Sequence, residues 1–145
     1  MTTKIVIDAS VVLKWVLRET YSEQAIDLLN ERNKYSFIAP DILVTEVANA
    51  LWKRVKIGEM QIEEAKAFHD AIFVEDIIDL HPSANYMERA FDLANNIQHN
   101  AIYDCVYLAM AESFHCNFIT ADHKLIKNAN KNSTSSNLRF IANLH

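Results

Sequence analysis

The sequence contains a single glycine, Gly58, and two prolines, Pro40 and Pro82. The phosphate-binding Walker A loop and the dinucleotide-binding fingerprint each need several glycines, because only glycine lets the backbone turn tightly against a phosphate. The scarcity of glycine therefore excludes both motifs, and we expect no nucleotide cofactor.

Cysteine is nearly as scarce. Cys105 and Cys116 bracket one predicted helix, and eleven helical residues span roughly 16 Å at about 1.5 Å per residue. That distance is too long for a disulfide, and neither cysteine belongs to a CxxC pair that would indicate zinc. We interpret both as free, buried thiols.

Long apolar runs are also absent. We find no signal peptide and no segment able to cross a bilayer, and therefore expect a soluble, cytoplasmic protein without membrane contact. The 145 residues are 50% hydrophobic, which is enough for one core. Because no repeat or linker divides the chain, residues 1–145 are predicted to form a single domain.

Positive charge is in deficit, with a formal net charge of -5. Most affinity for nucleic acid comes from neutralised phosphates, so this balance argues against a broad nucleic-acid-binding surface. Any such role must depend on a local basic patch or on bound metal.

The apolar segments predict an α/β fold. Ile5, Val6 and Ile7 are β-branched and do not alternate with polar residues, which is typical of a strand buried on both faces of a parallel sheet. Strands and helices then alternate, which predicts three α/β/α layers around a parallel sheet of four to five strands. The Asn- and Ser-rich stretch 128–137 is predicted to be a mobile loop. Further strands are predicted at 35–39, 77–80, 117–120 and 138–141, and helices at 11–17, 23–32, 42–56, 62–73, 84–97, 103–114 and 124–129.

Three aspartates are predicted to meet at one edge of this sheet. Asp8 and Asp122 directly follow strands, and Asp104 opens a buried helix that leads into the second of these strands. Because ligands of open α/β sheets bind at the carboxyl ends of the strands, we expect a site there. Clustered carboxylates repel one another unless a cation lies among them, and oxygen ligands suit Mg²⁺ or Mn²⁺. Glu46, in the second turn of the helix at 42–56, could supply a fourth carboxylate.

Each of these residues also has a simpler interpretation. The three aspartates lie near helix starts, where carboxylates cap free amides, and Glu46 alone reads as a solvated side chain. Ser10 and Thr120 could hold the carboxylates through their hydroxyls, or serve as a helix cap and a strand residue. Asn49 follows Glu46 on the same polar strip.

Four segments of the chain, taken together, form a recognisable pattern. They are Ile7-Asp8-Ala9-Ser10; Ala39-Pro40-Asp41 leading to Thr45-Glu46-Val47-Ala48-Asn49-Ala50-Leu51; Tyr103-Asp104-Cys105-Val106-Tyr107-Leu108-Ala109-Met110-Ala111-Glu112; and Thr120-Ala121-Asp122 with Leu125. In this order they resemble a PIN-domain ribonuclease of the VapC toxin type. The resemblance implies a PIN-like fold, RNA as substrate, and Mg²⁺ or Mn²⁺ bound by Asp8, Glu46, Asp104 and Asp122. It also implies a type II toxin–antitoxin pair, with a homodimer and a cognate antitoxin that lays a peptide segment near the active site.

This resemblance gives roles to further residues. A cation-activated water would attack the phosphodiester, with Asp8 or Asp104 as candidate general base. Of the six histidines, we single out His99, just before the buried helix. The cations expected near the site, alternatively solvated helix ends, are Lys14, Arg18, Lys53, Arg54 and Lys56. The aromatic residues that could line an antitoxin groove, or alternatively belong to the core, are Trp15, Trp52, Phe68 and Phe73.

Two other functions fit part of the pattern. A phospho-receiver domain also gathers acids around Mg²⁺, but it needs paired acids near the first strand and a phosphorylatable aspartate on a middle strand, where this chain offers Asp79. The third possibility is a PIN fold that binds RNA or protein without catalysis.

Overall fold

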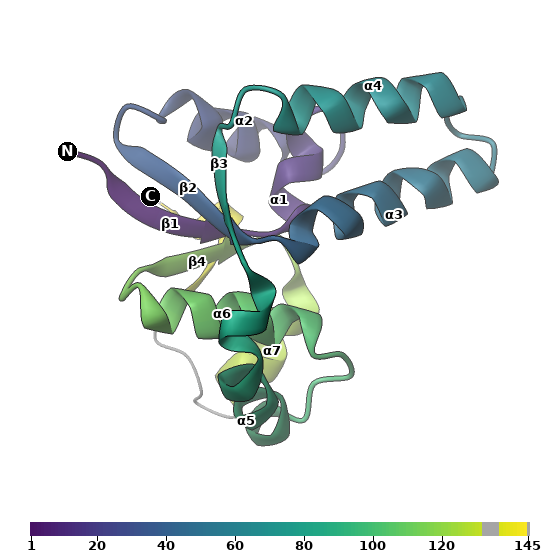
Figure 1. Cartoon of the computed structure of the whole chain (residues 1–145). Helices are drawn as coiled ribbons and strands as arrows, with labels where there is room; N and C mark the ends of the chain where they lie inside the picture. The colour runs from purple at the N-terminus through teal and green to yellow at the C-terminus, as the bar shows by residue number, and fades with distance from the viewer. Residues whose placement is uncertain (132–136, 145) are drawn as a thin grey trace.

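The fold is built around a five-stranded parallel sheet in the order β3-β2-β1-β4-β5. The computed structural model describes residues 1–131 and 137–144 (Figure 1). The predicted α/β/α fold with a parallel sheet is confirmed. The strands are β1 (Thr3–Ile7), β2 (Tyr35–Pro40), β3 (Ile78–His81), β4 (Asn117–Thr120) and β5 (Leu138–Phe140).

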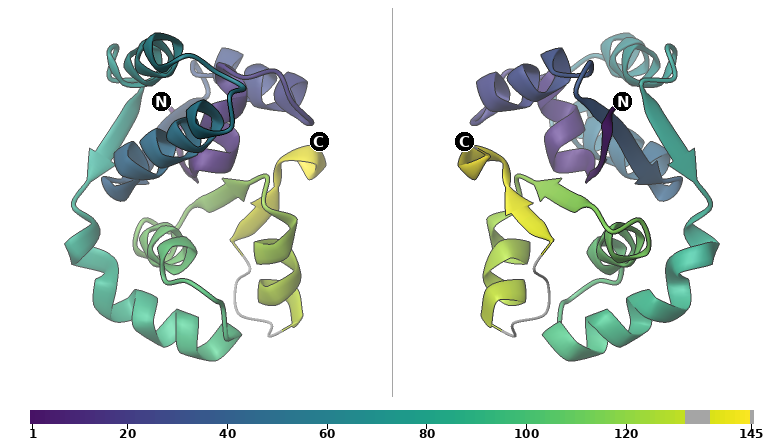
Figure 2. Two further views of the ribbon diagram at one scale, coloured as in Figure 1. Left: turned by 90° about the vertical axis from the view of Figure 1, so that its right-hand side faces the viewer. Right: turned by 90° about the vertical axis from the view of Figure 1, so that its left-hand side faces the viewer.

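Helices cover both faces of the sheet (Figures 1 and 2). On one face lie α1 (Ala9–Val12), α2 (Ser22–Asn30), α3 (Ile42–Lys56) and α4 (Ile62–Phe73). On the other lie α5 (Met87–Ile97), α6 (Tyr103–Ser113) and α7 (His123–Lys131). From β1 the chain moves across the sheet to β2 and then β3, whereas from β4 it moves the opposite way to β5. Because both connections are right-handed crossovers, the helices that follow β1 and the helix that follows β4 lie on opposite faces of the sheet.

The reversal of strand order positions the candidate site. β1 and β4 are neighbours with parallel registers, and their carboxyl ends open side by side. Residues that follow these two strands are therefore brought together, at the point where open α/β sheets bind their ligands. α6 packs beneath β1, β2 and β4 and is buried from Cys105 to Ala111.

Several element bounds differ from those predicted. The helix expected at 11–17 is one α-turn, α1, followed by a 3-10 helix (Leu13–Trp15), and the helix expected at 84–97 begins with a 3-10 helix (Ser83–Tyr86). α7 continues to Lys131, so the loop predicted at 128–137 is wrong over its first residues. Its remainder at 132–136 lies outside the described residues.

Cys105 is a buried free thiol, as predicted. Cys116 is also a free thiol but only half-buried, so the prediction that it is buried is wrong. Within residues 1–131 and 137–144, every helix is too short or too polar to cross a lipid bilayer.

Gly58 ends α3 in a left-handed conformation with φ +81°. Its N–H donates to Val55 O at 3.1 Å and that of Glu59 donates to Arg54 O at 3.0 Å, so the last carbonyl groups of the helix are satisfied. An added Cβ would meet no atom within 4 Å. Any cost of a side chain here therefore comes from the backbone conformation alone.

We expect Gly58→Ala to lower the free energy of unfolding by about 1 kcal/mol, because an L-residue is strained at this φ. Urea unfolding monitored by tryptophan fluorescence measures the change. Lys56→Ala, on the exposed last turn of α3, is the matched control and should leave stability nearly unchanged. Equal stabilities for Gly58→Ala and wild type would contradict the prediction.

Candidate active site

Asp8 lies buried at the exit of β1, with only 6% of the residue exposed. Its Oδ1 accepts hydrogen bonds from Ser10 Oγ at 2.5 Å and from Val11 N at 3.3 Å, and its Oδ2 accepts one from Thr120 Oγ1 at 2.6 Å. Burial raises the pKa of Asp8 to about 7, although these hydrogen bonds lower it, and the nearby charge of Asp104 raises it further. Asp8 is thus a carboxyl group that titrates near neutral pH.

Ser10 and Thr120 join the exits of β1 and β4. Their hydroxyl oxygens are 3.3 Å apart; Ser10 Oγ also accepts a hydrogen bond from Ala121 N at 2.9 Å, and Thr120 Oγ1 accepts one from Asp122 N at 3.1 Å. The two hydroxyls therefore hold Asp8 and the backbone before Asp122 in one network. Asp122 itself caps α7, because its Oδ1 accepts from the backbone N–H groups of residues 124 and 125 at 2.9 and 3.2 Å.

Glu46 reaches the site from the second turn of α3. Its Oε1 accepts a hydrogen bond of 2.6 Å from the hydroxyl of Tyr107, whose ring stacks on Phe118 at a centroid distance of 5.5 Å. Burial raises the pKa of Glu46, the Tyr107 bond lowers it, and the charge of Asp104 raises it. Burial and Glu46 together raise the pKa of Tyr107, which keeps its hydroxyl a neutral donor.

We assigned no role to Tyr107 from the sequence. The available signal was its spacing, because residues three apart on a helix share a face and Tyr107 lies three residues after Asp104. Its hydroxyl is a polar group within the buried stretch of α6.

Asp104 interacts electrostatically with the other three acids. It lies in the first turn of α6, and its Oδ2 is 2.7 Å from His99 Nε2. Burial raises the pKa of Asp104, the His99 hydrogen bond lowers it, and the charge of Asp122 raises it. Since Asp104 in turn raises the pKa of Asp8 and Glu46, the four residues form one electrostatic group, called here the acid cluster.

The chemistry of the acid cluster fits a hard divalent cation, since it offers only carboxylate oxygens. As the side chains stand, no three or more His, Cys, Asp or Glu residues among the described residues are grouped closely enough to hold a metal ion. Ligation by three of these acids therefore requires side-chain rotation, against the hydrogen bonds that now hold Asp8 and Glu46.

The predicted polar and basic neighbours fall into two groups. Lys14 Nζ and Arg54 Nη2 both pair with Glu19, at 2.9 and 2.8 Å, which ties the segment after α1 to α3. Lys14 and Arg18 also line a hollow of about 640 Å³ formed by the 3-10 helix after α1, the loop that follows it and the start of α2. The exposed residues are Arg18, Lys53, Lys56 and Asn49. Asn49 lies one turn beyond Glu46 on α3, with no hydrogen bond to the acid cluster within the described residues.

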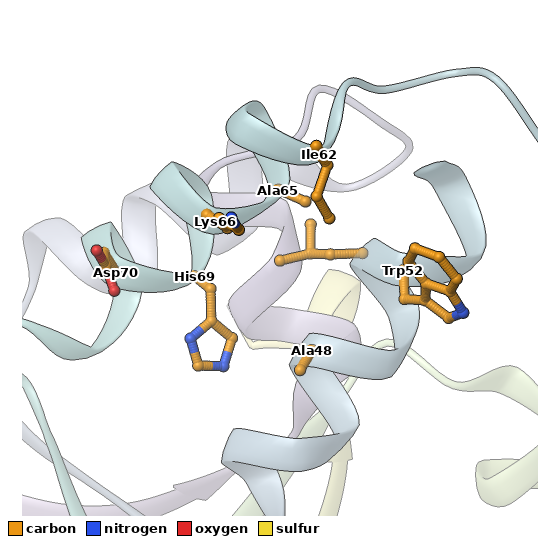
Figure 3. A pocket seen from close by; sticks show the side chains of 8 residues that line it. Ala48, Trp52, Ile62, Ala65, Lys66, His69 and Asp70 are labelled. Carbon is orange, nitrogen blue, oxygen red and sulfur yellow. The ribbon is translucent and has the colours of Figure 1, made fainter. Parts of the chain in front are cut away.

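A separate, mostly apolar hollow of about 270 Å³ lies between α3 and α4 (Figure 3). Half-exposed Trp52 on α3 and Ile62 on α4 flank it. Of the four aromatics proposed for a groove, Trp52 alone lines this hollow. Trp15 belongs to the core, since its ring packs on Phe37 and its Nε1–H donates to a backbone carbonyl on α2.

Comparison with known proteins identifies the family of the chain. Residues 5–131 match the PIN domain family. The chain is 30% identical over 124 residues to Ribonuclease VapC3 of Pyrobaculum aerophilum, covering 84% of this chain and 92% of that protein.

Solved structures share the fold at lower identity. The crystal structure of PAE2754 from Pyrobaculum aerophilum has a TM-score of 0.68 at 18% identity, covering 98% of this chain and 86% of that one. VapBC2 from Rickettsia felis, bound to a promoter DNA fragment, has a TM-score of 0.67 at 10% identity, covering 95% and 98%. VapC20 of Mycobacterium tuberculosis, a toxin that cleaves the sarcin-ricin loop, has a TM-score of 0.64 at 14% identity, covering 85% and 93%. The chain therefore belongs to the PIN domain family and is a homologue of a VapC ribonuclease.

Proposed function

We propose that the protein is a divalent-metal-dependent endoribonuclease and the toxin of a type II toxin–antitoxin pair. The observation that supports this proposal is the electrostatic coupling of Asp104 to Asp8, Glu46 and Asp122, in a chain homologous to a VapC ribonuclease. Raised pKa values at three of these carboxyl groups indicate that the protein alone does not offset their charge.

Mg²⁺ or Mn²⁺ would be held by carboxylates of the acid cluster. Such an ion supplies Lewis acidity toward the phosphodiester when it is bound. Ser10 and Thr120 hold Asp8, and Tyr107 holds Glu46, so these hydroxyl groups control how each carboxylate turns when an ion binds. Asp8 and Asp104 remain the two candidates for the general base.

RNA binding is proposed to use the cations near the acid cluster. Arg18, Lys53 and Lys56 are exposed and can reach flanking phosphates, whereas Lys14 and Arg54 are engaged by Glu19. An RNA phosphate must displace Glu19 to use the last two. By pairing with Lys14 and Arg54, Glu19 would therefore reduce the positive charge available to bind RNA phosphates.

The cognate antitoxin is proposed to insert an apolar segment into the hollow between α3 and α4. Trp52 and Ile62 are half-exposed apolar side chains there, and Lys66 and Asp70 supply charges at its rim. Apolar side chains on a helical or extended peptide commonly fill such grooves. The homodimer implied by the resemblance stays a prediction.

The phospho-receiver alternative finds no support in the geometry. Asp79 lies on the edge strand β3, is exposed, and pairs with His81 at 2.9 Å. It is therefore remote from the sheet edge where Asp8 and Asp122 meet. A non-catalytic PIN module remains the competing outcome of the activity test.

We expect the purified, antitoxin-free protein to cleave RNA with Mg²⁺ or Mn²⁺ and to be inactive in EDTA. Asp8→Asn and Asp104→Asn should each lower the cleavage rate by roughly 100-fold or more. This is a larger effect than removing a residue that only hydrogen-bonds to a metal ligand usually has. Product mapping on structured RNA measures this, and Asp27→Asn on the exposed face of α2 is the control. Unchanged rates in both cluster variants would refute the nuclease mechanism.

The metal-free acid cluster should destabilise the folded protein at high pH. The pKa of Asp8 is raised from 3.8 to about 7, so its contribution to stability is fully present below pH 4 and lost as the pH rises through 7. We expect Asp8→Asn in EDTA to raise the free energy of unfolding at pH 8 by roughly 2–4 kcal/mol, from 1.36 kcal/mol per pKa unit less any weakened hydrogen bonds.

Urea unfolding at pH 8, 6 and 4 measures this dependence. The advantage of Asp8→Asn should shrink steadily toward pH 4, and saturating Mg²⁺ should reverse it at pH 8 by stabilising the wild type. A variant less stable than wild type at pH 8 in EDTA would contradict the assigned cost of burying Asp8.

Glu19→Gln is expected to tighten RNA binding two- to fivefold, the range of one partly exposed ion pair. The substitution frees Lys14 for phosphates and leaves Arg54 with only its longer contact to Glu59, at 3.6 Å. Filter binding of uncleavable RNA without metal measures affinity, and a steeper loss of binding with added salt should accompany the gain. Glu63→Gln on α4 makes the same charge change at an exposed site. Equal effects of both variants would show that net charge alone is responsible.

A further inference from the structure

His99 connects Asp104 to a second helix through two hydrogen bonds. Its Nε2 is 2.7 Å from Asp104 Oδ2, its Nδ1 is 2.9 Å from Asn128 Nδ2, and 6% of its side chain is exposed. It follows Gln98, which ends α5 in a left-handed conformation with φ 51°. That turn directs the chain back so that a loop residue contacts both α6 and α7.

The two contacts have a consistent direction. The amide nitrogen of Asn128 is a donor, so Nδ1 of the ring accepts and the ring proton resides on Nε2. His99 then donates to Oδ2 of Asp104. The result is a chain of donors, from Asn128 through His99 to one specified oxygen of the carboxylate.

We propose that His99, oriented by Asn128, is a positioning residue that limits Asp104 to metal ligation through Oδ1. This inference rests on the metal-dependent function proposed above. Ca²⁺ takes six to eight oxygen ligands and often binds a carboxylate through both oxygens, whereas Mg²⁺ requires a compact octahedral shell. Holding Oδ2 therefore makes the site selective for Mg²⁺ and Mn²⁺ over Ca²⁺.

Asn128 also links Asp104 to the other acid on this side of the sheet. α7 begins directly after Asp122 and carries Asn128 in its second turn. The chain from Asn128 to Asp104 therefore fixes α7 relative to α6, and with it the spacing of Asp122 from Asp104. Loss of Asn128 should act in the same direction as loss of His99, with a smaller effect.

The test uses four variants of the full chain. His99→Phe keeps a ring but removes the donor, His99→Gln keeps an N–H at similar reach, and Asn128→Ala removes the orienting amide. His69→Phe is the matched control: His69 Nε2 also donates a half-buried hydrogen bond, to Val44 O at 2.9 Å, but on the α3–α4 side. Mn²⁺ and Ca²⁺ affinities are measured by isothermal titration calorimetry, with thermal unfolding and RNA cleavage in parallel.

We expect the wild type to bind Mn²⁺ more tightly than Ca²⁺. In His99→Phe the ratio of Mn²⁺ affinity to Ca²⁺ affinity should fall about tenfold, as expected for losing a residue that hydrogen-bonds to a metal ligand. His99→Gln should recover most of the ratio, Asn128→Ala should lower it less, and His69→Phe should leave it unchanged. A ratio in His99→Phe equal to that of wild type, or a matching loss in His69→Phe, would overturn the inference.

Two further outcomes are distinguishable. If His99→Phe does not fold, equal ratios for His99→Gln and Asn128→Ala overturn the positioning role, while a lower ratio for Asn128→Ala supports it. Wild type that binds Mn²⁺ without cleaving RNA refutes the nuclease function and leaves selectivity to decide this inference. Wild type that binds no divalent ion refutes both.

Discussion

The site depends on one constraint, which is that acidic side chains are buried where β1 and β4 end. The strand order reverses between these two strands, so residues that follow them are forced into proximity. α6 then covers the same edge from below and adds Asp104. Charge placed there is poorly solvated and repelled by its neighbours, which raises the pKa of each buried acid. A site with this property is stable either when protonated or when a cation compensates it.

Asp8 and Glu46 each accept one hydrogen bond from a residue far away in the sequence, Asp104 contacts a residue of the loop just before its helix, and Asp122 accepts from the start of α7. Thr120 of β4 donates to Asp8, Tyr107 of α6 donates to Glu46 of α3, and His99 contacts Asp104. Burial raises the pKa of Asp8, Glu46 and Asp104, whereas these hydrogen bonds lower it. The hydrogen bonds therefore offset part of the cost of ionising a buried carboxyl group. Because the donors and acceptors lie on separate elements, the geometry of the acid cluster is a property of the whole sheet and its helices.

The fold was predictable from the sequence, and so was the placement of Asp8 and Asp122 directly after strands, because both follow from local patterns. The unalternating run at residues 5–7 indicates a central parallel strand, and an acid just after a strand is placed by topology alone. The donors were not predictable in the same way. Tyr107 and Glu46 are 61 residues apart, and their contact depends on how α3 and α6 pack. Side-chain rotamers decide whether neighbouring acids form a ligand set, and no sequence spacing specifies them. The last helix was predicted to end too early, at residue 129, and residues from 128 onward were assigned to a loop. In this Asn-rich part of α7 the buried apolar residue is Ala129, which gives a weak helical pattern.

The composition and the site point to the same electrostatic problem. The formal net charge is -5, and Glu19 pairs with Lys14 and Arg54, two of the cations proposed to bind RNA. If the protein binds RNA as proposed, affinity built on neutralised phosphates would be weak without metal. Each divalent ion adds two positive charges at the acid cluster itself. The same event that relieves repulsion among the buried acids would then make the site attractive to RNA, so substrate binding and catalytic competence would share one requirement.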